Sequence, residues 1–92
     1  MTRGIELQPV RLAVGEQTVG RLIFYEGWLV GVISRLTEVH GPDAGRWFLE
    51  VGFGPLDGLD HPVFEDLHVA RQWVSEHLAG SALPQAASEP LE

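Results

Sequence analysis

The chain of 92 residues has no cysteine and no run of apolar residues long enough to cross a membrane. Without cysteine it can form no disulfide, no thiolate nucleophile and no cysteine-ligated zinc or iron–sulfur site. A membrane-spanning helix needs about 18 apolar residues in a row, so we expect no membrane partner. The opening residues Met1–Gly4 lack the apolar segment of a secretory signal, and we therefore expect a cytoplasmic protein.

Positive charge is scarce as well, because the chain contains no lysine and its six basic residues are all arginine. With 13 acidic residues the formal net charge is −7, and the arginines form no basic stripe or arm. Proteins bind nucleic acids largely by neutralising phosphates with lysine and arginine, so we expect no nucleic-acid partner. The 45% hydrophobic content is typical of one small globular domain with a single core.

The first half of the chain predicts consecutive β-strands. Ile5–Val14 alternates loosely between apolar and polar residues, and Pro9 favours an edge strand because proline cannot donate to a sheet ladder. Val19–Tyr25 and the segment from Trp28 to about Val39 are rich in β-branched and aromatic residues. Between them, Glu26–Gly27 supplies the glycine that a two-residue hairpin turn favours.

A fourth strand follows, with a strict alternation of apolar residues that is typical of a strand covered on one face. We expect this apolar stripe to face the helix, which leaves Phe48 and Glu50 on the opposite side. The next segment, Gly54–Pro62, is rich in glycine, proline and aspartate and predicts a loop. The residues of the stripe are Trp47, Leu49, Val51 and Phe53.

The period then changes to that of an α-helix. Asp66 is placed to cap its N-terminus and Gly80 to end it, while residues 81–92 predict a disordered tail. The fold class is therefore α+β, a four-stranded antiparallel meander followed by one C-terminal helix (β-β-β-β-α), with residues 1–80 forming one domain. The apolar face of the helix consists of Leu67, Ala70, Val74 and Leu78.

The two middle strands are apolar on both faces, whereas a sheet with one face in water normally alternates. A helix of about 13 residues is roughly 20 Å long and 10 Å wide, so it covers only one face. The other would expose on the order of several hundred Å², more than soluble monomers usually tolerate. We therefore expect a second copy of the chain to cover it in a homodimer, because two-fold dimers dominate among soluble oligomers. The alternative is a sheet that curls into a partial barrel and covers itself.

The choice of interface face depends on the register across Glu26–Gly27, because a slip of one residue exchanges the faces of a strand. One candidate set lies on the third strand and contains Trp28, Val30 and Val32. The other set contains Leu22, Phe24, Leu29 and Ile33. Together with Phe48 of the fourth strand, this second set is our predicted interface.

Residues capable of binding a metal ion are present, but their spacing does not match a known motif. His68 and His77 lie nine residues apart rather than the four that place two ligands on one helix face. Asp57, Asp60 and His61 share a loop and have the chemistry of ligands without a recognisable ligand spacing. We therefore expect no metal site.

Catalytic and cofactor motifs are equally weak. Ser34 lies in a predicted strand with no predicted base nearby, and no nucleophile-elbow motif surrounds it. Gly52–Gly54 matches the first half of a dinucleotide fingerprint, but no helix follows directly and the third glycine is missing. We expect no catalytic residue and no cofactor, and we interpret this glycine pair as a bulge or turn that closes the strand.

Three segments carry a resemblance to other proteins. They are Gly27–Ile33, Gly45–Pro55 and Phe64–Trp73, of which the last contains a Phe-x-x-Leu-x-x-Ala-x-x-Trp pattern. In these segments the chain resembles small uncharacterised bacterial proteins that pair a β-meander with a C-terminal helix. The resemblance covers a little over half of the chain and implies a fold, but no activity and no functional residues.

These observations together predict a non-enzymatic protein that self-associates as an interaction or structural module, and a separate protein partner is compatible with them. The alternative is a small-molecule-binding or weakly catalytic protein with a pocket between sheet and helix or at the dimer interface. A nucleic-acid binder is a third class, which the net charge of −7 disfavours.

Overall fold

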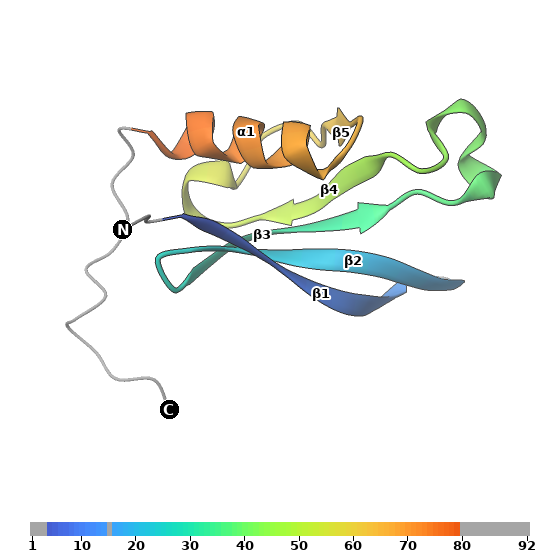
Figure 1. Cartoon of the computed structure of the whole chain (residues 1–92), viewed down its shortest axis with the longest axis horizontal. Coiled ribbons are helices and arrows are strands. Elements are labelled where there is room, and N and C mark those ends of the chain that lie inside the picture. The colour runs from blue at the N-terminus through green and yellow to red at the C-terminus, as the bar shows by residue number, and fades with distance from the viewer. Residues whose placement is uncertain (1–3, 15, 80–92) are drawn as a thin grey trace.

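The computed structural model describes residues 4–14 and 16–79, in which a five-stranded antiparallel sheet carries one α-helix on one face (Figure 1). Neighbouring strands of the sheet are also consecutive in the chain. The predicted α+β class with an antiparallel sheet and a C-terminal helix is confirmed, but the sheet has five strands rather than four. The elements are β1 (Ile5–Val14), β2 (Glu16–Tyr25), β3 (Trp28–Arg35), η1 (Glu38–Asp43), β4 (Trp47–Gly52), η2 (Gly54–Leu56), β5 (Val63–Phe64) and α1 (Leu67–Leu78), where η denotes a 3-10 helix.

The hairpin between β2 and β3 turns at Glu26 and Gly27, as the sequence predicts. Both residues have positive φ angles, 50° and 87°, as a type I′ turn requires. β1 forms one edge of the sheet, where Pro9 lies opposite Arg21. A proline is tolerated in an edge strand because one side of that strand has no ladder to complete.

The first of two register shifts lies in β3. Leu29 and Gly31 pair with consecutive residues of β2, so Val30 between them has no partner there. Such a bulge places two residues of one strand against one residue of its neighbour. It shifts the alternation of β3 by one position, with the result that Val30 and Ile33 are both buried in the core beneath the helix.

The second register shift lies in β4. Leu49 and Val51 pair with consecutive residues of β3, which makes Glu50 the extra residue. Trp47 and Leu49 are buried against the helix as predicted, but Val51 and Phe53 are 38% and 43% exposed. The predicted stripe is therefore wrong in its second half, because the bulge at Glu50 reverses the alternation.

The segment predicted as a loop, Gly54–Pro62, contains η2 and leads into the fifth strand. In that strand, Phe64 pairs with Trp47 of β4. η2 packs so closely on the sheet that a Cβ at Gly52 would lie 2.2 Å from the carbonyl oxygen of Leu56. The missing side chain at Gly52 therefore lets Leu56 enter the core, where it is 1% exposed.

α1 begins where the sequence predicts. The Asp66 carboxylate accepts a hydrogen bond of 2.9 Å from the backbone N–H of Val69, so the predicted N-cap is confirmed. The C-cap is Ala79, and both the predicted cap Gly80 and the predicted tail 81–92 lie outside the described residues. The core between helix and sheet consists of Ile23, Val30, Ile33, Trp47, Leu49, Leu56, Phe64, Ala70, Val74 and Leu78.

Candidate interaction surface

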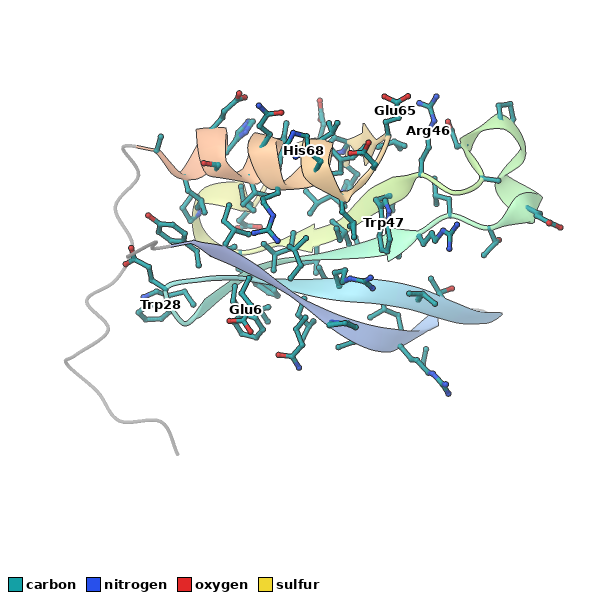
Figure 2. The ribbon with its side chains drawn as sticks, viewed as in Figure 1. Glu6, Trp28, Arg46, Trp47, Glu65 and His68 are labelled. Carbon is teal, nitrogen blue, oxygen red and sulfur yellow. The ribbon has the colours of Figure 1, made fainter. Side chains whose placement is uncertain are left out.

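The sheet face opposite α1 carries apolar side chains on all five strands, with polar residues among them on β1, β2 and β3. Figure 1 shows the helix on one side of the sheet, and none of the elements in residues 4–14 and 16–79 lies over the other side. Glu6, near the start of β1, points away from the helix on that side (Figure 2). We name this side the uncovered face. Its apolar residues are Val10, Leu12, Leu22, Phe24, Leu29, Val32, Phe48, Val51 and Val63.

The strand register arranges these side chains in rows across the sheet. Leu22, Val32 and Val51 are successive partners on β2, β3 and β4 and form the central row. Phe24 pairs with Leu29 in the neighbouring row toward the hairpin turn. Opposed residues in antiparallel strands have Cβ atoms about 4.5–5.5 Å apart, so the rows join into one continuous apolar surface.

Several of these side chains are open to solvent. Leu29, Val51 and Val63 are 37%, 38% and 39% exposed, and the other apolar residues of the uncovered face are half-buried by their neighbours. Exposed apolar side chains are ordinary when they are scattered singly over a surface. Here Leu29, Val51 and Val63 share one face of one sheet, whereas the similarly exposed Val69 lies on α1.

A polar pair lies within this apolar surface. The Ser34 hydroxyl donates a hydrogen bond of 2.5 Å to Oε2 of Glu50, and Ser34 is only 2% exposed. The bulge in β4 brings Glu50 to this position, and the sequence analysis did not pair the two residues. Because the serine is buried and already donates to a carboxylate, the geometry does not favour a nucleophilic role. A partner that covers this face must, however, meet a charged side chain.

His61 packs onto the rim of the uncovered face. Its ring stacks on Phe48 with centroids 5.7 Å apart, and its Nδ1 donates to the carbonyl oxygen of Leu49 at 2.7 Å. The loop after η2 thus partly shields the aromatic ring that we predicted for the interface. Among the described residues, no group of three histidine, aspartate or glutamate side chains is placed to hold a metal ion.

The predicted interface residues lie on the uncovered face, with one exception. Ile33 is 0% exposed and belongs to the core beneath α1, because the bulge at Val30 shifts it to the helix side. In the alternative set, Trp28 and Val30 also pack on the core, and only Val32 lies on the uncovered face. The predicted residues that do lie on it are Leu22, Phe24, Leu29 and Phe48.

The sheet is open rather than barrel-shaped. β1 and β5 lie at opposite edges, and within the described part of the chain β1 pairs with β2 alone. β1 therefore does not close the sheet into a barrel by pairing with another strand, although its Leu12 side chain packs over Gly20 on the uncovered face. The described residues leave this apolar surface accessible to a partner.

A hollow of about 370 Å³ lies between the sheet and the helix, at the place where the alternative function requires a pocket. Its lining includes Ile5, Tyr25, His68 and Arg71. The Arg71 guanidinium donates a hydrogen bond to the carbonyl oxygen of Ile5. This arginine therefore joins α1 to the edge strand, and its charge is engaged in a structural contact.

No family model, no curated protein and no solved structure matches the chain. The resemblance to small bacterial proteins accordingly stays a prediction. In the described parts of the chain, no helix combines the length and the apolar character needed to cross a membrane. What the protein does must therefore be inferred from its own surfaces.

Proposed function

We propose that this chain is a non-enzymatic interaction module that self-associates through the uncovered face. The observation that carries the proposal is the continuous apolar surface on the sheet side opposite α1. A helix of 12 residues is about 18 Å long and can cover only one side of such a sheet. Burying the second side recovers hydrophobic free energy of about 25 cal/mol for each Å² of apolar surface removed from water.

A second copy of the same chain is the occupant that fits this face best. Sheets pack face to face at a distance of about 10 Å, and a two-fold axis brings an apolar surface onto itself. An apolar face is self-complementary, and the described residues of the uncovered face include no arginine that would select an acidic partner. The interface is then isologous, with each residue facing the same region of the partner.

The size of the face implies a weak dimer. Five strands at a spacing of about 4.8 Å and five to six residues along each strand give a surface of about 20 Å by 20 Å. Stable interfaces bury about 800 Å² on each partner, which is more than this surface offers. We therefore expect an equilibrium between monomer and dimer at micromolar concentration, rather than a permanent assembly.

Charge gives this association a characteristic salt dependence. Each copy carries a formal net charge of −7, so two copies repel one another over long range. Added salt screens this repulsion, because the Debye length falls from about 30 Å at 0.01 M to about 10 Å at 0.1 M. Self-association should therefore strengthen as salt is added, whereas binding to nucleic acid would weaken.

The test uses two valines of equal exposure on different surfaces. Val51 lies on the uncovered face and is 38% exposed, and Val69 lies on α1 and is 37% exposed. Val51→Asp should abolish self-association, because dimerisation would desolvate its carboxylate, whereas Val69→Asp should leave it unchanged. Sedimentation velocity over a range of concentrations measures both variants and the wild-type chain.

Two outcomes would contradict the proposal. The first is a wild-type mass of 10.1 kDa that does not change with concentration or salt. The second is an equal loss of association in Val51→Asp and Val69→Asp, which would place the contact elsewhere or reflect net charge alone. Circular dichroism of both variants establishes that they are folded.

A further inference from the structure

A group of arginines occupies the helix-bearing side of the sheet, away from the uncovered face. Arg21 lies opposite Ile33, and Arg35 lies opposite Trp47, so the strand register puts both arginines on the side of the core. Arg11 joins them on β1, two residues beyond the partner of Arg21. This local positive charge contrasts with the net charge of −7 of the whole chain.

The side chain of Arg21 is held in place by two contacts. Its guanidinium carbon lies 5.2 Å from the centre of the Trp47 ring, and one of its nitrogens donates to the carbonyl oxygen of Gly20 at 3.2 Å. A planar guanidinium fixed on an aromatic ring loses little conformational freedom when it binds a ligand. Arg35 is the cross-strand partner of Trp47, so it lies next to Trp47 in the sheet, on the same side as Arg21.

Neither arginine is neutralised by the described residues. Among the side chains that the structure describes, no carboxylate forms an ion pair with Arg21 or Arg35. By contrast, Arg46 lies 3.9 Å from Asp43. Two cations carried on the same side of the sheet repel, and an anion that reaches both would relieve this repulsion and could accept N–H donors from each fork.

A hollow adjoins this pair and shares Arg35 with it. Its volume is about 460 Å³, within the range of small-molecule sites. Val19, Leu36 and Ala44 give it apolar walls, and the Glu38 carboxylate at its lining repels any anionic group inside the hollow, which leaves the side toward Arg35 and Arg21 for the anionic end of a ligand. The combination fits an uncharged organic body that carries a single anionic group.

We propose that this site binds a small organic oxyanion, with its phosphate or carboxylate group held by Arg21 and Arg35 and its uncharged body in the adjoining hollow. The site is on the opposite side of the sheet from the uncovered face, so the proposal does not depend on self-association. It also differs from a nucleic-acid site, since one hollow lined by Arg35, with Arg21 on the same side of the sheet, matches one anionic group rather than a phosphate backbone.

The test is a titration of the full chain, followed by the amide and indole N–H resonances in two-dimensional NMR. The probes are phenyl phosphate, benzoate and inorganic phosphate, each compared with sodium chloride at the same ionic strength. We expect phenyl phosphate or benzoate to shift the indole resonance of Trp47, identified by its loss in Trp47→Phe. Inorganic phosphate should bind more weakly, because it has no organic body to fill the hollow.

Substitutions then separate the site from general charge. Arg35→Gln should weaken binding of the best probe by about tenfold or more, the loss expected for a charge-assisted hydrogen bond. Arg46→Gln removes the same charge at a paired arginine and should change binding by less than about twofold. Because Arg35 is exposed, Arg35→Gln is expected to fold, and its thermal midpoint verifies this.

Three results would overturn the proposal. One is the absence of any shift beyond that of sodium chloride with all three probes. Another is equal weakening by Arg35→Gln and Arg46→Gln, which would indicate nonspecific attraction. The third is tighter binding of random single-stranded DNA than of either organic probe, which would assign the arginines to a polyanion instead. Preference between phenyl phosphate and benzoate tells which oxyanion the site selects.

Discussion

The two faces of the sheet are built from similar apolar side chains but differ in what covers them. On β4, Leu49 is 1% exposed beneath α1, while Val51, two residues further, is 38% exposed on the uncovered face. On β3, Ile33 is fully buried and its neighbour Val32 is half-buried on the other side. Apolar character alone therefore does not identify the face that a helix covers. What distinguishes the covered face is its fit to the helix and to η2.

That fit depends on small residues as much as on large ones. Gly31 and Gly52 are cross-strand partners on the covered face, and Leu56 of η2 packs over them. The uncovered face carries larger side chains such as Phe24 and Leu29 at its paired positions. One face is thus shaped to receive elements of its own chain, whereas the other presents a surface suited to a second sheet.

The largest expected effect is on the covered face. Leu49→Ala should lower the free energy of unfolding by about 2–5 kcal/mol, because it removes buried methyl groups and leaves a cavity beneath the helix. Leu29→Ala, on the uncovered face, should cost less than about 1 kcal/mol in the monomer. Urea unfolding at a concentration low enough to keep the chain monomeric compares the two variants. Equal losses would mean that the uncovered face is packed as a core within a single chain.

The next effect concerns the glycine pair. Gly52→Ala should destabilise the fold by about 1–3 kcal/mol, because its Cβ would lie 2.2 Å from the Leu56 carbonyl oxygen and force η2 to move. At Gly31 the nearest atoms would be 3.5 Å from an added Cβ, so Gly31→Ala is the matched control and should be nearly neutral. The difference between their urea midpoints measures how tightly η2 is held. Similar midpoints would show that η2 contributes little to the covered face.

The elements themselves could be predicted from the sequence because each leaves a local signal. Asp66 before an apolar period of three and four marks the helix start, and Glu26–Gly27 marks the hairpin. β5 has only two residues, Val63–Phe64, and no period can be recognised over so short a segment. It forms because Trp47 and Phe48 of β4 offer an unpaired edge, which is a tertiary cause.

The candidate surface could be predicted only in part. Strict alternation correctly places Leu22 and Phe24 on one face, but the bulges reverse the pattern beyond Val30 and Glu50. A glycine within a strand is a known sign of a bulge, and Gly31 next to Val30 provides that sign for β3. For β4 the sequence predicts a bulge or turn at Gly52–Gly54, whereas the bulge lies at Glu50 and becomes evident only from the pairing of β3 with β4.

A smaller effect is expected at the helix cap. Asp66→Ala should cost about 1 kcal/mol, because the N–H of Val69 loses its acceptor at the positive end of the helix dipole. Asp60→Ala removes an exposed carboxylate from the preceding loop and is the control, with an expected change within about 0.5 kcal/mol. Asp66→Ala weakens α1 without altering the uncovered face, so the affinity of the dimer should not change. A coupled loss of affinity would mean that the two faces do not act independently.

The smallest effect, and the one of opposite sign, is expected at the polar pair of the uncovered face. Glu50→Gln keeps an oxygen that can accept the Ser34 hydrogen bond but removes the charge that self-association would desolvate. We therefore expect the dimer to become tighter by about threefold, which corresponds to roughly 0.7 kcal/mol. Glu76→Gln on α1 reduces the net charge equally and corrects for long-range repulsion. Sedimentation at fixed ionic strength measures both, and equal tightening would show that Glu50 lies outside the contact between the two sheets.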